Sequence, residues 1–526
     1  MTGASASLSP GAVGRASIIV GAGFTGAQAV GIVRELYLAS HVGLSGDLDA
    51  LLVSLGLTTL ASGLITGGAS GALVPLYLEA RALHGREDAR RLSGSVIAWL
   101  ALAGLVISLA IAVLAPFLTE ISGPGLRPDD HERATLYLRF LTPVMFITVI
   151  TTMMRVVCQA EDSFGSIALA TVAGPATTLA TMLLLWEPLR LNALVIGSIT
   201  GSVASLAVYV AATARVDAIP IPRLTTDPRL GALVRHAVPV TLSGGILEFR
   251  GIVDRAIATL LGPGSVSALR YAMVLITPLT QIGPAWSSVV YPRLVHLTLG
   301  VQDNSLAAWA EKTLRSVVAI FLPVAALTVA VAPLAVFFAY GRGAFTPEDM
   351  RLTAATLAAY APIVVTLMML PVLVGSLNAR RRGGMLLIGG ALNVALNVVL
   401  DIIFAYWLGA PGIALATSIA EILVVAVFIR SMSRSGDAFD LRPFVRTIVR
   451  SVLAIAPFAL AIGALSWSGF GARDTLTAAL LLAVYAVVGV GGYVLVASSL
   501  GIESAKDVLA AVAERFARIR GTGART

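Results

Sequence analysis

The chain has 526 residues, of which 57% are hydrophobic and 13% charged, and its formal net charge is +8. This composition lies far outside the range of soluble globular proteins and excludes a chain made mainly of water-soluble domains. With a single cysteine, Cys158, no disulfide can form within the chain.

Long apolar stretches follow one another along almost the whole sequence. A hydrocarbon core about 30 Å thick is crossed by about 20 apolar helical residues. The stretches are too continuous for barrel strands, which alternate in polarity. The sequence therefore predicts an all-α integral membrane protein with about 14 transmembrane helices, at residues 16–41, 49–77, 92–118, 134–158, 164–186, 192–214, 237–261, 267–292, 313–339, 352–378, 384–407, 411–430, 448–468 and 475–499.

The basic residues are distributed unevenly between the loops. If the N-terminus is cytoplasmic, the inside loops hold arginine-rich runs within 81–91, 215–235, 293–315, 380–382 and 430–450. The outside loops hold only Arg127, Arg133, Arg190, Arg342, Arg351 and Arg473. This bias predicts that both termini are cytoplasmic and that the positive charge sets topology. We expect no nucleic-acid partner, and residues 1–13 lack the basic region of a signal peptide.

The chain also contains an internal repeat. Pro128-Asp129-Asp130 and Pro347-Glu348-Asp349 lie 219 residues apart, and each precedes a span with a central proline. The repeat predicts two six-helix lobes related by a pseudo-two-fold axis, which enclose a substrate site and rock around it. The predicted domains are an N-terminal lobe at 1–215, a cytoplasmic linker at 216–236 ending in a short amphipathic helix, a C-terminal lobe at 237–433, an extra helix pair at 434–502, and an amphipathic cytoplasmic tail at 503–526.

Charged residues inside apolar spans are costly, so each one suggests a site. Arg34, Arg255 and Arg270 lie in the first, seventh and eighth spans, and a cationic cavity there would suit a phosphate or pyrophosphate. Arg34 is adjacent to Glu35, and Arg255 to Asp254. Because adjacent residues face different directions on a helix, we expect the partners of these pairs to lie on other spans or on a ligand.

A second set of candidates carries oxygen atoms. Asn397 and Asp401 are four residues apart and share a helix face, and Asp254 and Thr417 extend the set. Hard oxygen ligands favour a small hard cation, and protonation of the aspartates is the competing interpretation. We find neither a catalytic constellation nor a glycine-rich nucleotide loop in the sequence, so an enzyme is not expected.

Several segments together resemble the MurJ/MviN family, the lipid II flippases of the multidrug/oligosaccharidyl-lipid/polysaccharide exporter superfamily. The similar segments are GIVRE at 31–35 with Gly43 and Asp49, GGASGALVP at 67–75, VDR at 253–255, GSVSAL at 264–269 with Tyr271-Ala272, YGRGAFT at 340–346, Asn397 with Asp401, and ALATS at 414–418.

The resemblance implies fourteen helices in two lobes around a cavity for the diphosphate and sugar of a polyprenyl lipid, with a groove at the last two helices for its tail. It implies a Na⁺ site at Asp254, Asn397, Asp401, the Ile413 carbonyl and Thr417. The implied substrate-binding positions are Gln28, Arg34, Asp49, Arg255 and Arg270.

The chain departs from the family at several cavity arginines. Gln28 stands where the family has an arginine in the first helix, Ala61 or Ser62 replaces the one in the second, and Val274 replaces the one in the eighth. Arg270 lies four residues before Val274, on the same helical face.

These observations predict a monomeric flippase of the bacterial cytoplasmic membrane. It would move a polyprenyl-diphosphate-linked saccharide, with lipid II as the first candidate, by cation-coupled alternating access. Its expected partners are this glycolipid and membrane lipids. The alternatives are a flippase for another lipid-linked oligosaccharide, a cation-coupled drug exporter, a membrane-embedded glycan polymerase or transferase, and a non-transporting envelope scaffold.

Overall fold

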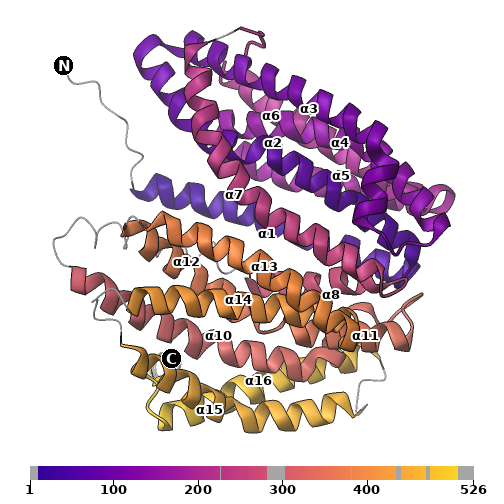
Figure 1. Cartoon of the computed structure of the whole chain (residues 1–526), viewed down its shortest axis with the longest axis vertical. Coiled ribbons are helices and arrows are strands. Elements are labelled where there is room, and N and C mark those ends of the chain that lie inside the picture. The colour runs from indigo at the N-terminus through magenta and orange to yellow at the C-terminus, as the bar shows by residue number, and fades with distance from the viewer. Residues whose placement is uncertain are drawn as a thin grey trace, which may run out of the picture. The chain divides into compact units, whose positions relative to one another are not determined.

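A computed structural model describes residues 10–225, 227–280, 303–380, 382–433, 440–468 and 474–506. All regular elements in these ranges are α-helices, which confirms the all-α prediction (Figure 1). They are α1 (Pro10–Val42), α2 (Gly46–His84), α3 (Arg86–Ser122), α4 (Pro128–Ala160), α5 (Phe164–Leu189), α6 (Asn192–Arg215), α7 (Pro228–Thr259), α8 (Ser265–Thr280), α10 (Asp303–Tyr340), α11 (Pro347–Tyr360), α12 (Ile363–Ala379), α13 (Gly383–Leu408), α14 (Ala410–Ser433), α15 (Leu441–Trp467) and α16 (Thr475–Ser499).

Each of the predicted spans corresponds to helix in the part of the chain that the structure describes. Among the described residues, eleven helical segments are long and apolar enough to cross a membrane. The first and seventh predicted spans are α1 and α7, and the shorter apolar helix α8 stands at the eighth. The tenth span is divided into α11 and α12 just before Pro362, which has no backbone N–H to continue the helical ladder.

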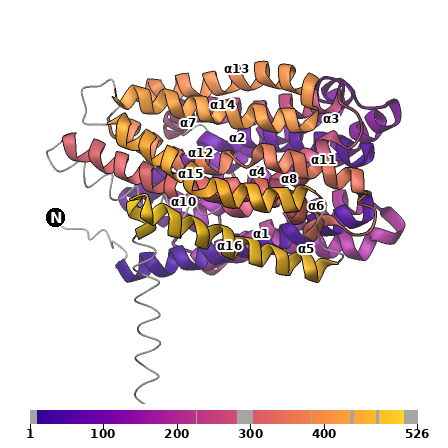
Figure 2. The same cartoon turned by 90° about the horizontal axis from the view of Figure 1, so that it is seen from below.

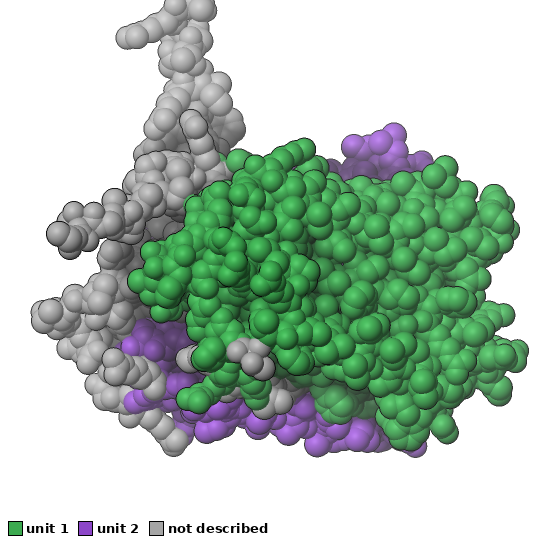
Figure 3. Space-filling model, turned by 90° about the horizontal axis from the view of Figure 1, so that it is seen from above, with its two compact units in different colours: residues 1–37, 45–263 green, residues 38–44, 264–526 purple. Residues whose placement is uncertain are grey.

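The described chain forms two compact units (Figure 3). Unit 1 comprises residues 1–37 and 45–263, and unit 2 comprises residues 38–44 and 264–526. This division follows packing and therefore differs from the lobes predicted from the sequence repeat, in which the seventh span belongs to the second half. The lobe boundaries remain a prediction.

Unit 1 is built around α2, which packs against α3, α4 and α7, while α5 and α6 pair with each other and α6 contacts α4. Helix α7 belongs to this unit because both of its ends are held there. Near its start, the Arg229 guanidinium is bound by Asp88 of α3. At its end, the hydroxyl of Thr259 accepts a 3.1 Å hydrogen bond from the backbone N–H of Gly125.

Helix α10 lies at the centre of unit 2, where it contacts α11, α12, α15 and α16. Helix α14 packs against α13. Helices α15 and α16 lie side by side in both views (Figures 1 and 2). Between them and α10, the buried Tyr493 hydroxyl donates a 2.6 Å hydrogen bond to the Ala319 carbonyl. The end of α1 belongs to unit 2 because the Ser40 carbonyl accepts a 2.8 Å hydrogen bond from the N–H of Ala344.

The repeated Pro-acidic motif begins a helix in both halves. Pro128 and Pro347 occupy the first turns of α4 and α11, where the missing proline N–H costs nothing. At α11 the Thr346 hydroxyl accepts a hydrogen bond from the N–H of Asp349, whose carboxylate accepts one from the N–H of Thr346. The two motifs therefore share a proline at the helix start, whereas the capping box is present at α11 and no side chain caps α4.

The linker between α6 and α7 differs from its prediction in its second part. Its second part is not a separate amphipathic helix, because α7 runs without a break from Pro228 to Thr259. The non-helical segment before α7 lies along α3. There the Arg90 side chain donates a 2.9 Å hydrogen bond to the Ile219 carbonyl, and the Trp99 indole donates a 3.2 Å hydrogen bond to the Thr225 carbonyl. Of the predicted tail helix at 503–520, residues 503–506 are helical and the rest lies outside the described residues.

Candidate functional site

The first candidate cation, Arg34, lies in the last third of α1 and is half-buried, with Gln28 nearly two turns earlier. Its Nη2 atom lies 2.8 Å from Oε1 of the buried Glu35, so the expectation that the adjacent pair does not neutralise itself is wrong. The long arginine side chain folds along the helix to reach its neighbour. The Nε atom of Arg34 is buried and has no hydrogen-bond partner, which leaves donor capacity on this guanidinium.

The second candidate cation, Arg255, packs against a glycine of the neighbouring helix. A Cβ atom added to Gly56 of α2 would lie 2.0 Å from Nη1 of Arg255, so the missing side chain provides the room for the guanidinium. Asp254 precedes Arg255 on α7, and Asp49 in the first turn of α2 is 1% exposed. Asp49 of α2 and Asp254 and Arg255 of α7 thus lie on two helices of unit 1 that pack against each other, and Arg255 lies at their contact.

The third candidate cation, Arg270, lies on α8 in unit 2 and is exposed, whereas Val274 one turn later is buried. The structure thus places Asp49 on α2 and Asp254 and Arg255 on α7, and these two helices pack against each other. Gln28 and Arg34 lie on α1 of the same unit. That these five residues meet in one site remains a prediction. A single cavity shared with Arg270 remains a prediction.

The predicted oxygen site of unit 2 lies between α13 and α14. Asn397 donates a 3.1 Å hydrogen bond from Nδ2 to the Thr417 hydroxyl. That hydroxyl in turn donates to the Ile413 carbonyl at 3.1 Å. The side chains of Asn397, Asp401 and Thr417 are at most 2% exposed, and Asn397 and Asp401 lie one turn apart on the same face of α13.

This donor set fits a small hard cation. The amide oxygen of Asn397, the carboxylate of Asp401, the Thr417 hydroxyl and the Ile413 carbonyl are all hard oxygen ligands away from bulk water. A monovalent cation or a proton bound here would contribute to the charge compensation of the buried Asp401 carboxylate. Asp254 lies on α7 in unit 1, and its membership of the same site remains a prediction.

A glycine-dependent turn holds α13 against α14. Gly409 ends α13 with φ at 67°, a left-handed conformation that favours glycine. Three residues later, a Cβ atom on Gly412 would lie 2.1 Å from the Phe404 carbonyl oxygen. The two helices therefore meet closely at the end of the hairpin nearest Asp401 and Ile413.

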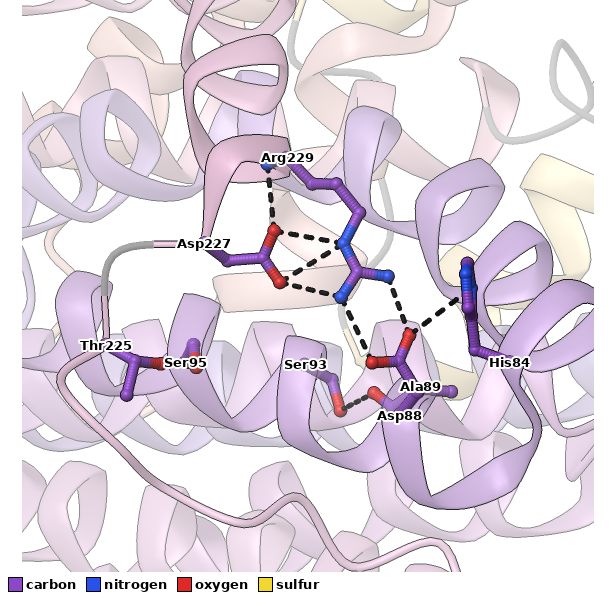
Figure 4. Close-up of polar contacts among 8 residues, drawn as sticks. All are labelled: His84, Asp88, Ala89, Ser93, Ser95, Thr225, Asp227 and Arg229. Carbon is purple, nitrogen blue, oxygen red and sulfur yellow. Dashed lines mark hydrogen bonds and ion pairs between the residues drawn. The ribbon is translucent and has the colours of Figure 1, made fainter.

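An ion network at the start of α7 was not singled out from the sequence. Arg229 lies between two carboxylates and binds both through paired donors, with Nη1 2.7 Å from Oδ2 of Asp88 and Nη2 2.6 Å from Oδ2 of Asp227 (Figure 4). The side-chain hydrogen bonds from Arg229 lower the pKa of the Asp227 carboxyl. Asp227 and Arg229 form a recognisable helix start around Pro228, whereas the pairing with Asp88 joins residues 141 positions apart, which no local pattern indicates.

A family model described as lipid II flippase MurJ matches residues 38–486. The chain belongs to this family. A probable lipid II flippase MurJ of Rhizobium meliloti (strain 1021) is 26% identical over 466 residues, covering 86% of each chain. A lipid II flippase MurJ of Burkholderia cenocepacia is 24% identical over 439 residues, covering 80% of this chain and 84% of the relative. The family assignment confirms the resemblance inferred from the sequence motifs.

Solved structures show the same fold. A lipid II flippase MurJ in an inward closed conformation superposes with a TM-score of 0.75 at 19% identity, covering 92% of this chain and 98% of that one. An inward-facing multidrug resistance MATE transporter of the MOP superfamily gives 0.61 at 17% identity, covering 79% and 96%. The protein therefore has the fold of a membrane transporter, as predicted, and its family is one of flippases.

Proposed function

We propose that this protein translocates lipid II across the bacterial cytoplasmic membrane for cell-wall synthesis. The observation that carries the proposal is the lipid II flippase family match, which runs from the end of α1 into α16. Arg34 and Arg255 support it, because arginine donors within a membrane protein suit a diphosphate group. The polyprenyl tail would lie along the groove at α15 and α16.

The transport cycle would be alternating access coupled to Na⁺. The buried oxygen set at Asn397, Asp401, Ile413 and Thr417 supports a cation site, and Asp254 would complete it. When bound, Na⁺ would neutralise the Asp401 carboxylate. Thr417 and Asn397 supply neutral oxygens that a site for protons alone does not need, which favours Na⁺ over protonation.

The remaining parts of the proposal concern topology and assembly. The arginine bias of the loops supports a chain with both termini in the cytoplasm. It would act as a monomer, because a single chain carries every residue of the proposed substrate and cation sites.

A second substrate is favoured by the departures from the family pattern. Gln28, Val274 and either Ala61 or Ser62 stand where the family has arginines. Ala61, Ser62 and Val274 are at most 9% exposed in the structure. With fewer cations in the cavity, another polyprenyl-linked oligosaccharide is the alternative cargo.

The test is complementation of a bacterial strain depleted of its own lipid II flippase. The wild-type chain is expected to restore growth, and Arg34→Ala is expected to fail at equal protein abundance. Lysis with the wild-type chain correctly inserted would contradict lipid II as the cargo, and rescue of a strain lacking an exopolysaccharide flippase would then identify the alternative.

A further inference from the structure

A basic cavity in unit 2 is lined by none of the residues proposed for the substrate headgroup or for the cation. It has a volume of about 210 Å³ and is formed where α10 and α15 begin and α16 has ended. Lys312 and Arg315 of α10 and Arg446 and Arg450 of α15 line it, together with the hydroxyl groups of Ser316 and Ser504. Glu503 contributes a carboxylate to the lining.

Among the described residues, few carboxylates compensate the positive charges of this basic cavity. In unit 1, arginines of the predicted inside loops pair with carboxylates, such as Arg81 with Glu161 at 3.0 Å and Arg90 with Asp217 at 3.0 Å. In the cavity, Arg315 lies 3.7 Å from Glu311 and 4.0 Å from Glu503, and its Nε atom is buried without a hydrogen-bond partner. Within the described residues, Lys312, Arg446 and Arg450 form no ion pair.

The placement of the arginines disfavours an empty cavity. Arg446 and Arg450 are four residues apart on α15, so their like charges lie on one face and repel each other. An anion between them and Arg315 would remove this repulsion and supply acceptors for several guanidinium donors. Paired guanidinium donors match the oxygens of a phosphate group.

The surface next to the arginines indicates which kind of molecule carries this phosphate group. Leu453 and Leu460 continue the face of Arg446 and Arg450 along α15 at helical spacing, and they are 60% and 73% exposed. A basic end followed by an exposed apolar stripe fits a molecule with an anionic headgroup and hydrocarbon chains. Because α15 is long and apolar enough to cross a membrane, its exposed stripe would face acyl chains, and a lipid beside it could place its headgroup in the basic end.

We propose that the basic cavity binds the phosphate headgroup of an anionic phospholipid, whose acyl chains lie along the exposed face of α15. Basic pockets between membrane helices at the cytoplasmic surface are sites of this kind, and the arginine bias predicts that this end of unit 2 is cytoplasmic. The proposal does not depend on which glycolipid the protein transports.

The experiment measures the thermal stability of the purified full-length protein in detergent with increasing dioctanoyl phosphatidylglycerol. A ligand that binds the folded state raises its Tm in a saturable way. We expect such a rise with this lipid and none with dioctanoyl phosphatidylcholine or with inorganic phosphate at equal concentration. An equal rise with inorganic phosphate would overturn the phospholipid as the ligand.

Variants then test the position of the site. Arg450→Gln and Arg446→Gln are each expected to weaken the apparent affinity about tenfold, and Arg450→Lys is expected to recover part of it. Arg430→Gln is the matched control, because it removes the same charge from a residue that is exposed at the end of α14 and lies outside the cavity. Equal affinity for the wild type and Arg450→Gln would overturn the site.

A gain of affinity excludes misfolding as the explanation. Glu503→Gln removes the carboxylate that lines the basic cavity, and we expect it to strengthen binding of phosphatidylglycerol about threefold to tenfold. Weaker or unchanged binding in this variant would contradict the assignment of the cavity to an anion.

Discussion

Asn397 on α13 donates a hydrogen bond to the hydroxyl of Thr417 on α14, and the two residues are 20 positions apart in the chain. The contact joins the two helices of a hairpin through polar groups that are buried away from bulk water. Because Thr417 also donates to the Ile413 carbonyl, one hydroxyl fixes two of the oxygen ligands proposed for Na⁺. Substitution of Thr417 therefore tests the proposed coupling ion directly.

The first prediction concerns Thr417→Val, which preserves shape and removes the hydroxyl. It leaves the Asn397 amide without its acceptor, so we expect a loss of about 1–3 kcal/mol of stability. We also expect the Na⁺-dependent rise in Tm to disappear, as it should in Asp401→Ala. The wild-type protein is expected to gain about 2.7 kcal/mol at a Na⁺ concentration of 100 Kd, with no equivalent gain in K⁺.

Ser418→Ala is the control for this prediction. Ser418 is the next residue on α14, is buried, and donates a 2.7 Å hydrogen bond to the Ala359 carbonyl outside the oxygen set. It is expected to lose similar stability and to keep the response to Na⁺. If the wild-type protein melts at the same temperature in Na⁺ and K⁺ while transport follows pH, protons replace Na⁺ as the coupling ion.

The second prediction concerns Arg34. Its guanidinium has a buried Nε without a hydrogen-bond partner, so Arg34→Ala removes a donor held for an anion. We expect flipping to fall about 10- to 100-fold, which is the scale of a lost hydrogen bond to a charged group. Outer-leaflet labelling of the lipid-linked glycan measures this. Arg139→Gln on the exposed face of α4 is expected to flip normally, and a normal rate in Arg34→Ala would remove Arg34 from the substrate site.

The third prediction concerns the space next to Gly56 that the Arg255 guanidinium occupies. In Gly56→Ala the new methyl group displaces the Arg255 guanidinium, the flexible end of a side chain, so we expect a stability change below about 1 kcal/mol and a clear loss of transport. Gly63→Ala is the matched control on the same helix, because a Cβ there meets nothing within 4 Å. Equal transport by the two alanine variants would show that the position of Arg255 has no part in transport.

The fourth prediction concerns pH and the ion network at the start of α7. Because Arg229 depresses the folded-state pKa of Asp227 below its unfolded value of about 3.9, this stabilisation is present above about pH 4 and is lost as pH falls through the depressed pKa. Arg229→Gln is expected to cost about 1 kcal/mol at pH 7, or roughly 1–2 °C in Tm for a chain of this length. The difference from the wild type is expected to shrink below about pH 4.

The exposed pair Arg91 and Glu87 on α3 provides the comparison for this network. Arg91→Gln is expected to leave Tm unchanged at both pH values, since an exposed ion pair contributes little. A deficit in Arg229→Gln that stays constant from pH 7 to pH 3 would mean that Arg229 acts through packing and not through its charge.

The sequence predicted the helices well and their packing poorly. Apolar runs of membrane length specify helices locally, because a backbone in lipid must satisfy its own hydrogen bonds. The contact between Asn397 and Thr417 was also within reach, since the helices of a short hairpin must be neighbours. By contrast, the room that Gly56 leaves for Arg255 and the pairing of Arg229 with Asp88 join distant parts of the chain.

The most direct test of the proposed function is the rate at which lipid II becomes accessible in the outer leaflet. It is measured in cells whose own flippase is depleted and which express this chain, beside Arg34→Ala at equal abundance. We expect the wild-type chain to restore labelling of lipid II from outside and the variant to leave lipid II unlabelled. Lipid II that remains confined to the inner leaflet in cells with the inserted wild-type chain would contradict it.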